Sequence, residues 1–196
     1  GVKTYKLPVN IPVNCPNRDG NIGVGGCTFC GEYGAGFENL SSDISVKNQL
    51  INTKDHIAEN YGAKKFIAYF QSFTNTYLAI AELKKYILEV LKVKDIVEIS
   101  LSTRPDCISE EYLKDINKLL KQNNSQINLS LEVGLQTVNY HTLKSVNRGH
   151  GLAEFIDSVL KAKKYGVEVG VHLILNLPGD DMLDVIENAR VLSALG

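Results

Sequence analysis

The feature that most constrains this sequence is the alternation of short β-branched runs with longer segments of helical period. Four runs are typical of buried parallel strands: Lys64–Phe70, Val97–Thr103, Ile127–Gly134 and Val167–Leu175. A fifth run, Tyr5–Val13, contains Pro8 and Pro12, which cannot donate ladder hydrogen bonds. We therefore expect it to form an irregular first strand or a strand at a sheet edge.

Between these runs, apolar residues recur every three or four positions, which predicts amphipathic helices. The stripes run from Val46 to Tyr61, Ile80 to Leu91, Leu113 to Leu120, Leu152 to Val159 and Met182 to Ala189. Ser109 and either Asp180 or Asp181 are the expected helix starts. Such a series requires a parallel sheet with right-handed crossovers, either an open doubly wound sheet or part of a barrel. Five strand–helix units are too few for a closed eight-fold barrel, so we expect any barrel to be partial.

The composition describes one globular domain of 196 residues, without linkers, low-complexity tracts or charge blocks. The hydrophobic fraction of 44% and charged fraction of 22% exclude a disordered or collagen-like chain. No apolar run is long enough to cross a bilayer. The 21 basic residues nearly cancel the 22 acidic ones, which disfavours non-specific binding to nucleic acid. The first residues lack the pattern of a secretory signal, so we expect a cytoplasmic protein.

Three of the four cysteines, Cys15, Cys27 and Cys30, lie within 16 residues, and Cys107 stands alone. The two-residue spacing of Cys27 and Cys30 lets both thiolates face one metal centre, with Cys15 as a third ligand. Seven of the 16 glycines lie between Gly20 and Gly36, which implies unusual backbone angles and close approach to a bulky group. Zinc sites and [4Fe–4S] clusters normally take four protein ligands, so three thiolates would leave one iron open to an external ligand.

Two other interpretations of these cysteines remain open at this point. One is a redox dithiol formed by Cys27 and Cys30, and the other is a zinc-stabilised binding module completed by a distant histidine. We expect Cys107 to be an inert buried thiol.

Polar side chains follow the predicted strands at the sheet end where parallel α/β proteins bind ligands. They include Gln71, Ser72, Arg104, Asp106, Glu132, Gln136, Arg148, His172 and Asn176. Three of the four arginines, Arg18, Arg104 and Arg148, lie in loops that follow strands, and arginine suits the recognition of carboxylates and phosphates. The alternative is that Arg104 and Arg148 cap helices or pair with Asp106 and Glu132 as scaffold.

With these residues in place, the chain resembles the radical S-adenosylmethionine (SAM) superfamily. The signature CPNRDG…GGCTFC at Cys15–Cys30 has the spacing of the YhcC-like branch. A more distant resemblance links the chain to the radical SAM domains of the elongator catalytic subunit and of oxygen-independent coproporphyrinogen oxidase. The resemblance runs from about Tyr5 to Gly179, through YFQSFTNTY, STRPD, LEVGLQT, NRGH and HLILNLPGD.

The resemblance implies that Cys15, Cys27 and Cys30 hold a [4Fe–4S] cluster whose fourth iron is chelated by SAM. It places Phe29 near the adenine, and Gln71 and Ser72 where many relatives have a glycine-rich motif for the SAM amino group, although this chain lacks the GGE sequence. Glu132 and Gln136 would contact the sugar or the amino-acid end, and Arg148 the carboxylate. His172 stands where distant relatives have an aspartate for the ribose, and Asn176 replaces a glycine.

The same resemblance implies reductive cleavage of SAM to a 5′-deoxyadenosyl radical, an electron donor of the flavodoxin or ferredoxin type, and a substrate that the sequence does not name. Barrels of this superfamily usually have six strand–helix units. We therefore expect residues 1–196 to be one radical SAM core domain whose C-terminal part is missing. We also expect an exposed strand edge at Val167–Leu175 and an incomplete cavity.

Overall fold

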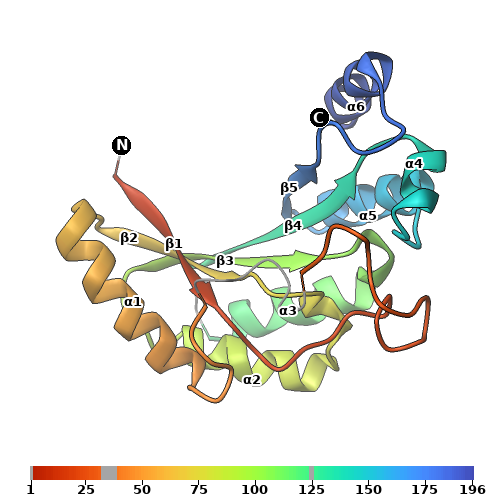
Figure 1. Cartoon of the computed structure of the whole chain (residues 1–196). Helices are drawn as coiled ribbons and strands as arrows, with labels where there is room; N and C mark the ends of the chain where they lie inside the picture. Colours follow the sequence, from red (N-terminus) through yellow and green to blue (C-terminus); the bar gives the residue numbers. More distant parts are fainter. Residues whose placement is uncertain (1, 32–38, 124–125) are drawn as a thin grey trace.

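The structure is a computed structural model that describes residues 2–31, 39–123 and 126–196 (Figure 1). Its centre is one sheet of five strands, in which every neighbouring pair is parallel and the strand order follows the sequence. The strands are β1 (Thr4–Val9), β2 (Lys65–Phe70), β3 (Ile96–Thr103), β4 (Asn128–Gln136) and β5 (Glu168–Leu173). The alternation predicts a parallel α/β sheet, either doubly wound or part of a barrel, and the observed sheet advances in one direction without closing, as in the partial barrel that the resemblance implies.

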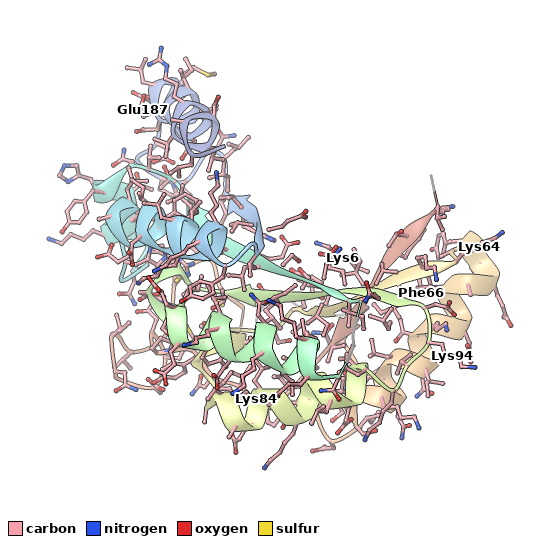
Figure 2. All side chains as sticks on the ribbon, turned by 180° about the vertical axis from the view of Figure 1, so that it is seen from behind. Lys6, Lys64, Phe66, Lys84, Lys94 and Glu187 are labelled. Atoms are coloured by element: carbon pink, nitrogen blue, oxygen red, sulfur yellow. The ribbon has the colours of Figure 1, made fainter. Side chains whose placement is uncertain are left out.

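Helices connect the strands, and Figure 1 shows α1, α2, α3 and α5 on one face of the sheet. The α-helices are α1 (Val46–Tyr61), α2 (Ile80–Val90), α3 (Glu110–Gln122), α4 (Tyr140–Ser145), α5 (Leu152–Lys164) and α6 (Met182–Leu195). Two 3₁₀-helices, η1 (Asn75–Tyr77) and η2 (Pro105–Cys107), follow β2 and β3. Figure 2, seen from behind, shows the molecule extending from Lys64 and Lys94 at one end to Glu187 on α6 at the other.

The helix starts are set by local side-chain caps. The hydroxyl of Ser109 accepts a hydrogen bond from the Tyr112 amide and begins α3. The carboxylate of Asp181 accepts from the amides of Leu183 and Asp184 and begins α6. Each cap satisfies backbone donors that the first helical turn leaves without intrahelical partners. The predicted helix start at Ser109 is confirmed. Of the two residues expected to start the last helix, Asp180 and Asp181, the N-cap is Asp181.

The core lies between the sheet and its covering helices. Alternate residues of β3 and β4, such as Leu101 and Leu131, are fully buried against apolar helix positions such as Ile87, Leu113 and Phe155. Burial of each such side chain stabilises the fold by about 1.5–3 kcal/mol before the entropy of ordering is subtracted. The stripes of α2, α3 and α5 are therefore the faces that hold these helices on the sheet. The stripe predicted from Met182 to Ala189 is not such a face, since Met182 is 70% and Ile186 41% exposed on α6.

The five predicted strands are all present, with ends that shift by a few residues. The largest shift is in the first strand, which ends at Val9 instead of continuing to Val13. Beyond it, the buried side chain of Gln49 accepts from the Asn10 amide and donates to the Asn10 carbonyl, both at 2.8 Å. A side chain thus satisfies the backbone at the point where Pro12 prevents a longer ladder.

The sheet ends in two edge strands, β1 and β5, each of which pairs with one neighbour among the described residues. The expected strand edge within Val167–Leu175 is therefore present, although β5 itself ends at Leu173. A side chain of β1 also reaches across the concave face of the curved sheet, because Lys6 Nζ lies 2.5 Å from Glu132 Oε1 on β4. No helix among the described residues is both long and apolar enough to span a bilayer.

Candidate functional site

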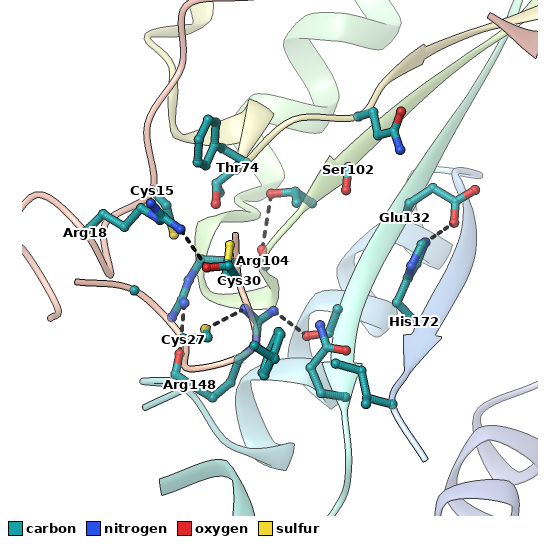
Figure 3. Close-up of a pocket in the computed structure, with 18 of the residues that line it drawn as sticks. Cys15, Arg18, Cys27, Cys30, Thr74, Ser102, Arg104, Glu132, Arg148 and His172 are labelled. Carbon is teal, nitrogen blue, oxygen red and sulfur yellow. Dashed lines mark hydrogen bonds and ion pairs between the residues drawn. The ribbon is translucent and has the colours of Figure 1, made fainter. Parts of the chain in front are cut away.

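A cavity of about 280 Å³ opens at the carboxyl ends of the strands (Figure 3). This volume is near the lower end of the range for small-molecule sites. Most of the predicted site residues line it, namely Cys15, Cys27, Phe29, Cys30, Gln71, Glu132, Gln136, Arg148 and His172. The structure therefore brings together residues that are up to 157 positions apart, because parallel strands end at the same side of the sheet.

The three cysteines come from the loop that follows β1, and none of them is disulfide-bonded. The loop is folded by its own backbone, since the amides of Arg18 and Cys30 donate to the carbonyls of Cys15 and Cys27 at 2.8 and 3.0 Å. Gly26 has a φ of 82°, and a Cβ there would lie 2.9 Å from Arg18 Nε. This glycine therefore permits both the turn and the close passage of the Arg18 side chain.

The segment after α4 is docked on the cysteine loop. The Val146 carbonyl accepts from the Thr28 amide at 3.1 Å. The Asn147 carbonyl accepts from Asn17 Nδ2 at 2.5 Å, and Asn147 Nδ2 donates to the Gly26 carbonyl at 2.8 Å. The NRGH motif thus orders the loop that carries the cysteines, a role that the sequence alone did not reveal.

Arg104 has a scaffold role, as the alternative in the sequence analysis proposed. Its guanidinium is buried and bonds both carboxylate oxygens of Asp106, at 2.9 and 2.8 Å, while Nη1 donates to the Arg148 carbonyl at 2.8 Å. Burial lowers the pKa of Arg104, but the bonds and charge of Asp106 outweigh it and raise the pKa above its usual value. Arg104 therefore fixes the backbone of Arg148.

Arg148 is buried beside the cysteine loop. Its Nη2 donates to the Gly134 carbonyl at 2.7 Å and its Nη1 to Cys27 Sγ at 3.6 Å, whereas its Nε has no partner among the described residues. Burial lowers the pKa of this guanidinium. A Cβ at Gly134 would lie 2.5 Å from Gln136 Nε2 and 2.7 Å from Arg148 Nη2, so only glycine leaves room for both side chains.

A break in the β4–β5 register sets the position of Gln136. Gly134 is paired with His172 and Gln136 with Leu173, so Leu135 is the extra residue of a bulge. Gln136 itself has a φ of 75°, an uncommon angle for a residue other than glycine. Bulges of this kind change the direction of side chains near functional sites, and here Gln136 is placed on the cavity wall.

Glu132 and His172 form a pair on the side of the cavity opposite the cysteines (Figure 3). His172 Nε2 lies 2.6 Å from Glu132 Oε2, and Lys6 Nζ approaches the other carboxylate oxygen. The hydrogen bond from His172, together with that from Lys6, outweighs burial and lowers the pKa of Glu132 to about 2. Glu132 is therefore an anion whose two oxygens are already bound by the protein, and it pairs with neither Arg104 nor Arg148.

Two predicted site residues do not line the cavity. Ser72 is buried, and its hydroxyl accepts from Asn39 Nδ2 at 2.8 Å. Asn176 lies beyond the end of β5 with a φ of 62°. Cys107 is outside the lining as well; burial, followed by the charge of Asp106, raises the pKa of its thiol to about 12. That thiol is protonated at neutral pH, in keeping with the expectation of an inert cysteine.

The cavity lining also includes residues that the sequence did not single out, among them Tyr69, Phe73, Ser102 and Thr103. Tyr69 and Ser102 lie inside strands whose composition predicts burial, and a polar residue at alternate strand positions is the signal that marks their cavity-facing side. The ring of Phe73 packs against the guanidinium of Arg18, with 5.3 Å between the ring centroid and Arg18 Cζ. Phe73 also has a φ of 54°. No pattern in the sequence predicts this positive φ at Phe73.

Comparison with known proteins is consistent along the whole chain. The family described as "Radical SAM superfamily" matches residues 9–192. The uncharacterized protein YtqA of Bacillus subtilis is 36% identical over 196 residues, which is 100% of this chain and 59% of YtqA. Protein YhcC of Escherichia coli K12 is 34% identical over 187 residues, 95% of this chain and 58% of YhcC. The chain thus spans less than two thirds of these relatives.

More distant similarity extends to named enzymes and solved structures. The tRNA-2-methylthio-N(6)-dimethylallyladenosine synthase of Campylobacter concisus is 23% identical over 201 residues, 95% of this chain and 42% of that protein. Archaeal Elp3 of Methanocaldococcus infernus has a TM-score of 0.65 at 18% identity, covering 94% of this chain and 41% of Elp3. Coproporphyrinogen III oxidase (HemN) of Escherichia coli, described as a radical SAM enzyme, has a TM-score of 0.64 at 18% identity, covering 100% of this chain and 42% of HemN. The two structures share the fold, and the family match over nearly the whole chain shows that this protein belongs to the radical SAM superfamily.

Proposed function

We propose that this chain is the core of a radical SAM enzyme that binds a [4Fe–4S] cluster through Cys15, Cys27 and Cys30, and SAM in the adjoining cavity. The observation that carries the proposal is that three unbridged cysteines from one loop line the same cavity as polar side chains of β4 and β5. Superfamily membership in general implies the same two cofactors.

The donor set fits this cluster better than a single ion. Among the described residues, no group of three or more His, Cys, Asp or Glu side chains converges closely enough to hold one metal ion. Each cysteine of a [4Fe–4S] cluster binds a different iron, so the sulfurs are spread around a cavity wall instead of converging on one point. Three thiolates also leave one iron for an external ligand. The zinc module is therefore the weaker candidate.

The cavity residues divide between the two ends of the proposed SAM site. Phe29 is exposed enough to pack against an adenine, and Gln71 and Gln136 present amide groups. Arg148 would meet the carboxylate from its place on the cavity wall. His172 would meet the ribose while Glu132 fixes the orientation of its ring. Ser72 and Asn176 remain proposed contributors only through the backbone around them, because neither side chain lines the cavity.

When bound, the cluster and SAM would supply one-electron cleavage of the sulfonium and a 5′-deoxyadenosyl radical that abstracts hydrogen from a substrate. The protein's part is placement and exclusion of water, for which apolar side chains such as Leu173 and Ile174 on the cavity wall are suited. Arg148 would neutralise a carboxylate in a buried setting, where the interaction is weakly screened. No general base is required of Glu132.

The proposal extends to a cytoplasmic setting, an electron donor of the flavodoxin or ferredoxin type, and one core domain completed by a further C-terminal part. The near balance of charge gives no broad field for nucleic acid. However, one relative over 95% of the chain is named for a tRNA product, so transfer RNA is the first substrate class to test. Small metabolites are the other class.

Anaerobic reconstitution of the full chain with iron and sulfide, followed by dithionite and SAM, tests the function. We expect brown protein that releases 5′-deoxyadenosine. A colourless protein that retains stoichiometric zinc and unfolds with a chelator would instead support the binding module. A colourless, metal-free protein in which Cys27 and Cys30 interconvert reversibly between dithiol and disulfide would support the dithiol. The proposal would be contradicted if the properly reconstituted chain released no 5′-deoxyadenosine and a protein of the full length of its relatives, reconstituted in the same way, released none either.

A further inference from the structure

Cys27 differs from Cys15 and Cys30 in its surroundings. It is buried, with 6% of its surface exposed, whereas the other two are partly exposed. Its sulfur accepts hydrogen bonds from two side-chain nitrogens, Asn17 Nδ2 at 3.5 Å and Arg148 Nη1 at 3.6 Å. Figure 3 shows the bond from Arg148 as it reaches the sulfur. The sulfur of Cys27 thus has two side-chain donors, one from the cysteine loop and one from the segment after α4.

Both donors are held in place by further bonds. Asn17 is 1% exposed, and its Nδ2 also donates to the Asn147 carbonyl. The guanidinium of Arg148 is anchored by the Gly134 carbonyl, and its main-chain carbonyl is bound by Arg104. Since each donor has a second fixed partner, neither is able to turn away from the sulfur without breaking another buried bond.

The charge near Cys27 is also positive. Two buried guanidinium groups, Arg104 and Arg148, lie in this network, and the carboxylate of Asp106 balances one of them. Arginine does not lose its proton in proteins, even where burial lowers its pKa. Hydrogen bonds to a sulfur ligand and nearby positive charge both favour the more negative, reduced state of an iron–sulfur cluster, which raises its reduction potential.

We propose that Asn17 and Arg148 are positioning residues that raise the reduction potential of the cluster by donating to the sulfur of Cys27. This inference rests on the proposed function, because it requires a cluster bound by the three cysteines. It is separate from any contact between Arg148 and SAM, since the bond to Cys27 uses Nη1 and is present without SAM.

The test is a redox titration of the reconstituted full chain without SAM, followed by the EPR signal of the reduced cluster. Arg148→Met removes the donor and the charge, and Asn17→Leu removes the donor at similar volume. We expect both substitutions to shift the midpoint to lower potential. A downward shift of about 59 mV corresponds to a tenfold lower ratio of reduced to oxidised cluster at a fixed potential. Arg148→Lys keeps the charge and shifts the midpoint less. The control Lys84→Met removes a charge from the outer side of α2, outside the cavity lining, and leaves the midpoint unchanged.

Variants that load iron as the wild type does and titrate at the wild-type midpoint overturn the proposal. If the variants lose the cluster, wild-type protein grown with ¹⁵N-labelled arginine decides the question. Its reduced cluster shows ¹⁵N hyperfine coupling that persists in Arg18→Lys if the bond from Arg148 to Cys27 Sγ exists, and the absence of such coupling overturns the proposal as well. Failure of the proposed function is a different result, in which the wild-type chain itself takes up no [4Fe–4S] cluster.

Discussion

His172 Nε2 lies 2.6 Å from Glu132 Oε2, and Lys6 Nζ lies 2.5 Å from the other oxygen of the same carboxylate. One acidic side chain of β4 is therefore bound from β5 on one side and from β1 on the other. This arrangement and the buried arginines near the cysteine loop lead to four predictions about stability and metal loading.

Glu132→Gln should lower the unfolding free energy at neutral pH, because it removes the charge that binds Lys6 and His172. The expected loss is only about 1–2 kcal/mol, since Lys6 and His172 are half-exposed and solvent screens the contacts. The folded-state pKa of Glu132, about 2, is below the usual value of about 4.3 for glutamate. The carboxylate thus contributes stability above about pH 4.3, and that contribution is lost as the pH falls toward about 2.

Denaturant unfolding at a series of pH values measures this effect. The gap between wild type and Glu132→Gln should narrow as the pH falls through that window, whereas Glu59→Gln, at an exposed position on α1, should follow the wild-type profile. A gap that stays constant down to about pH 2 would show that charge is not what the Glu132 contacts provide.

Gly134→Ala should destabilise the protein by about 1–3 kcal/mol, because the new Cβ would meet Gln136 Nε2 at 2.5 Å and the anchored guanidinium of Arg148 at 2.7 Å. Displacement of Arg148 should also lower the iron content after reconstitution. At Gly151 a Cβ meets its nearest atom at 3.5 Å, so Gly151→Ser is the matched control. Thermal unfolding and iron assay of both variants check the prediction, and equal loss in both would contradict it.

Arg104→Met should cost about 3–5 kcal/mol, because it leaves the largely buried carboxylate of Asp106 without its bidentate partner. Removal of both members in Arg104→Met/Asp106→Leu should cost less than the sum of the single changes, which a double-mutant cycle measures. Lys164→Met, at an exposed ion pair with Glu110, should leave the unfolding free energy nearly unchanged. Additive losses at Arg104 and Asp106 would show that the pair is not coupled.

Cys27→Ala should abolish cluster uptake, whereas Cys107→Ala should leave it intact. Cys27 lines the cavity, but Cys107 lies outside the lining, and the raised pKa of its thiol, about 12, keeps it protonated. Iron and sulfide per chain after anaerobic reconstitution give the comparison. Equal loss from both substitutions would contradict the assignment of ligands.

The order of strands and long helices could be predicted because each depends on a local period. The strand run at Val97–Thr103 and the cap at Ser109 need only neighbouring residues to be recognised, and both were found within one residue. Helix α4 was missed because six residues, Tyr140–Ser145, are too few to display a helical stripe.

The parts of the candidate site that depend on a distinctive residue spacing were predictable from the sequence. The parts that depend on the direction in which a side chain points were not. The cysteine spacing identified the loop, and strand ends identified the cavity. However, Ser72 faces Asn39 instead of the cavity, and the bulge beside Gly134 sets the direction of Gln136. Lys6 escaped notice because its partner is 126 positions away, and such a contact depends on the curvature of the sheet. These outcomes follow from tertiary geometry, which periodicity does not encode.

The contact of Lys6 with Glu132 links the strand that precedes the cysteine loop to the strand that precedes Arg148. One lysine side chain therefore joins two strands that are separated in the sheet by β2 and β3, and it ends on a carboxylate that lines the cavity. A residue at position 6 that is too short to reach Glu132 would break this link. Glu132 would then keep its hydrogen bond with His172, and β1 would be connected to β4 only through the backbone ladders of β2 and β3.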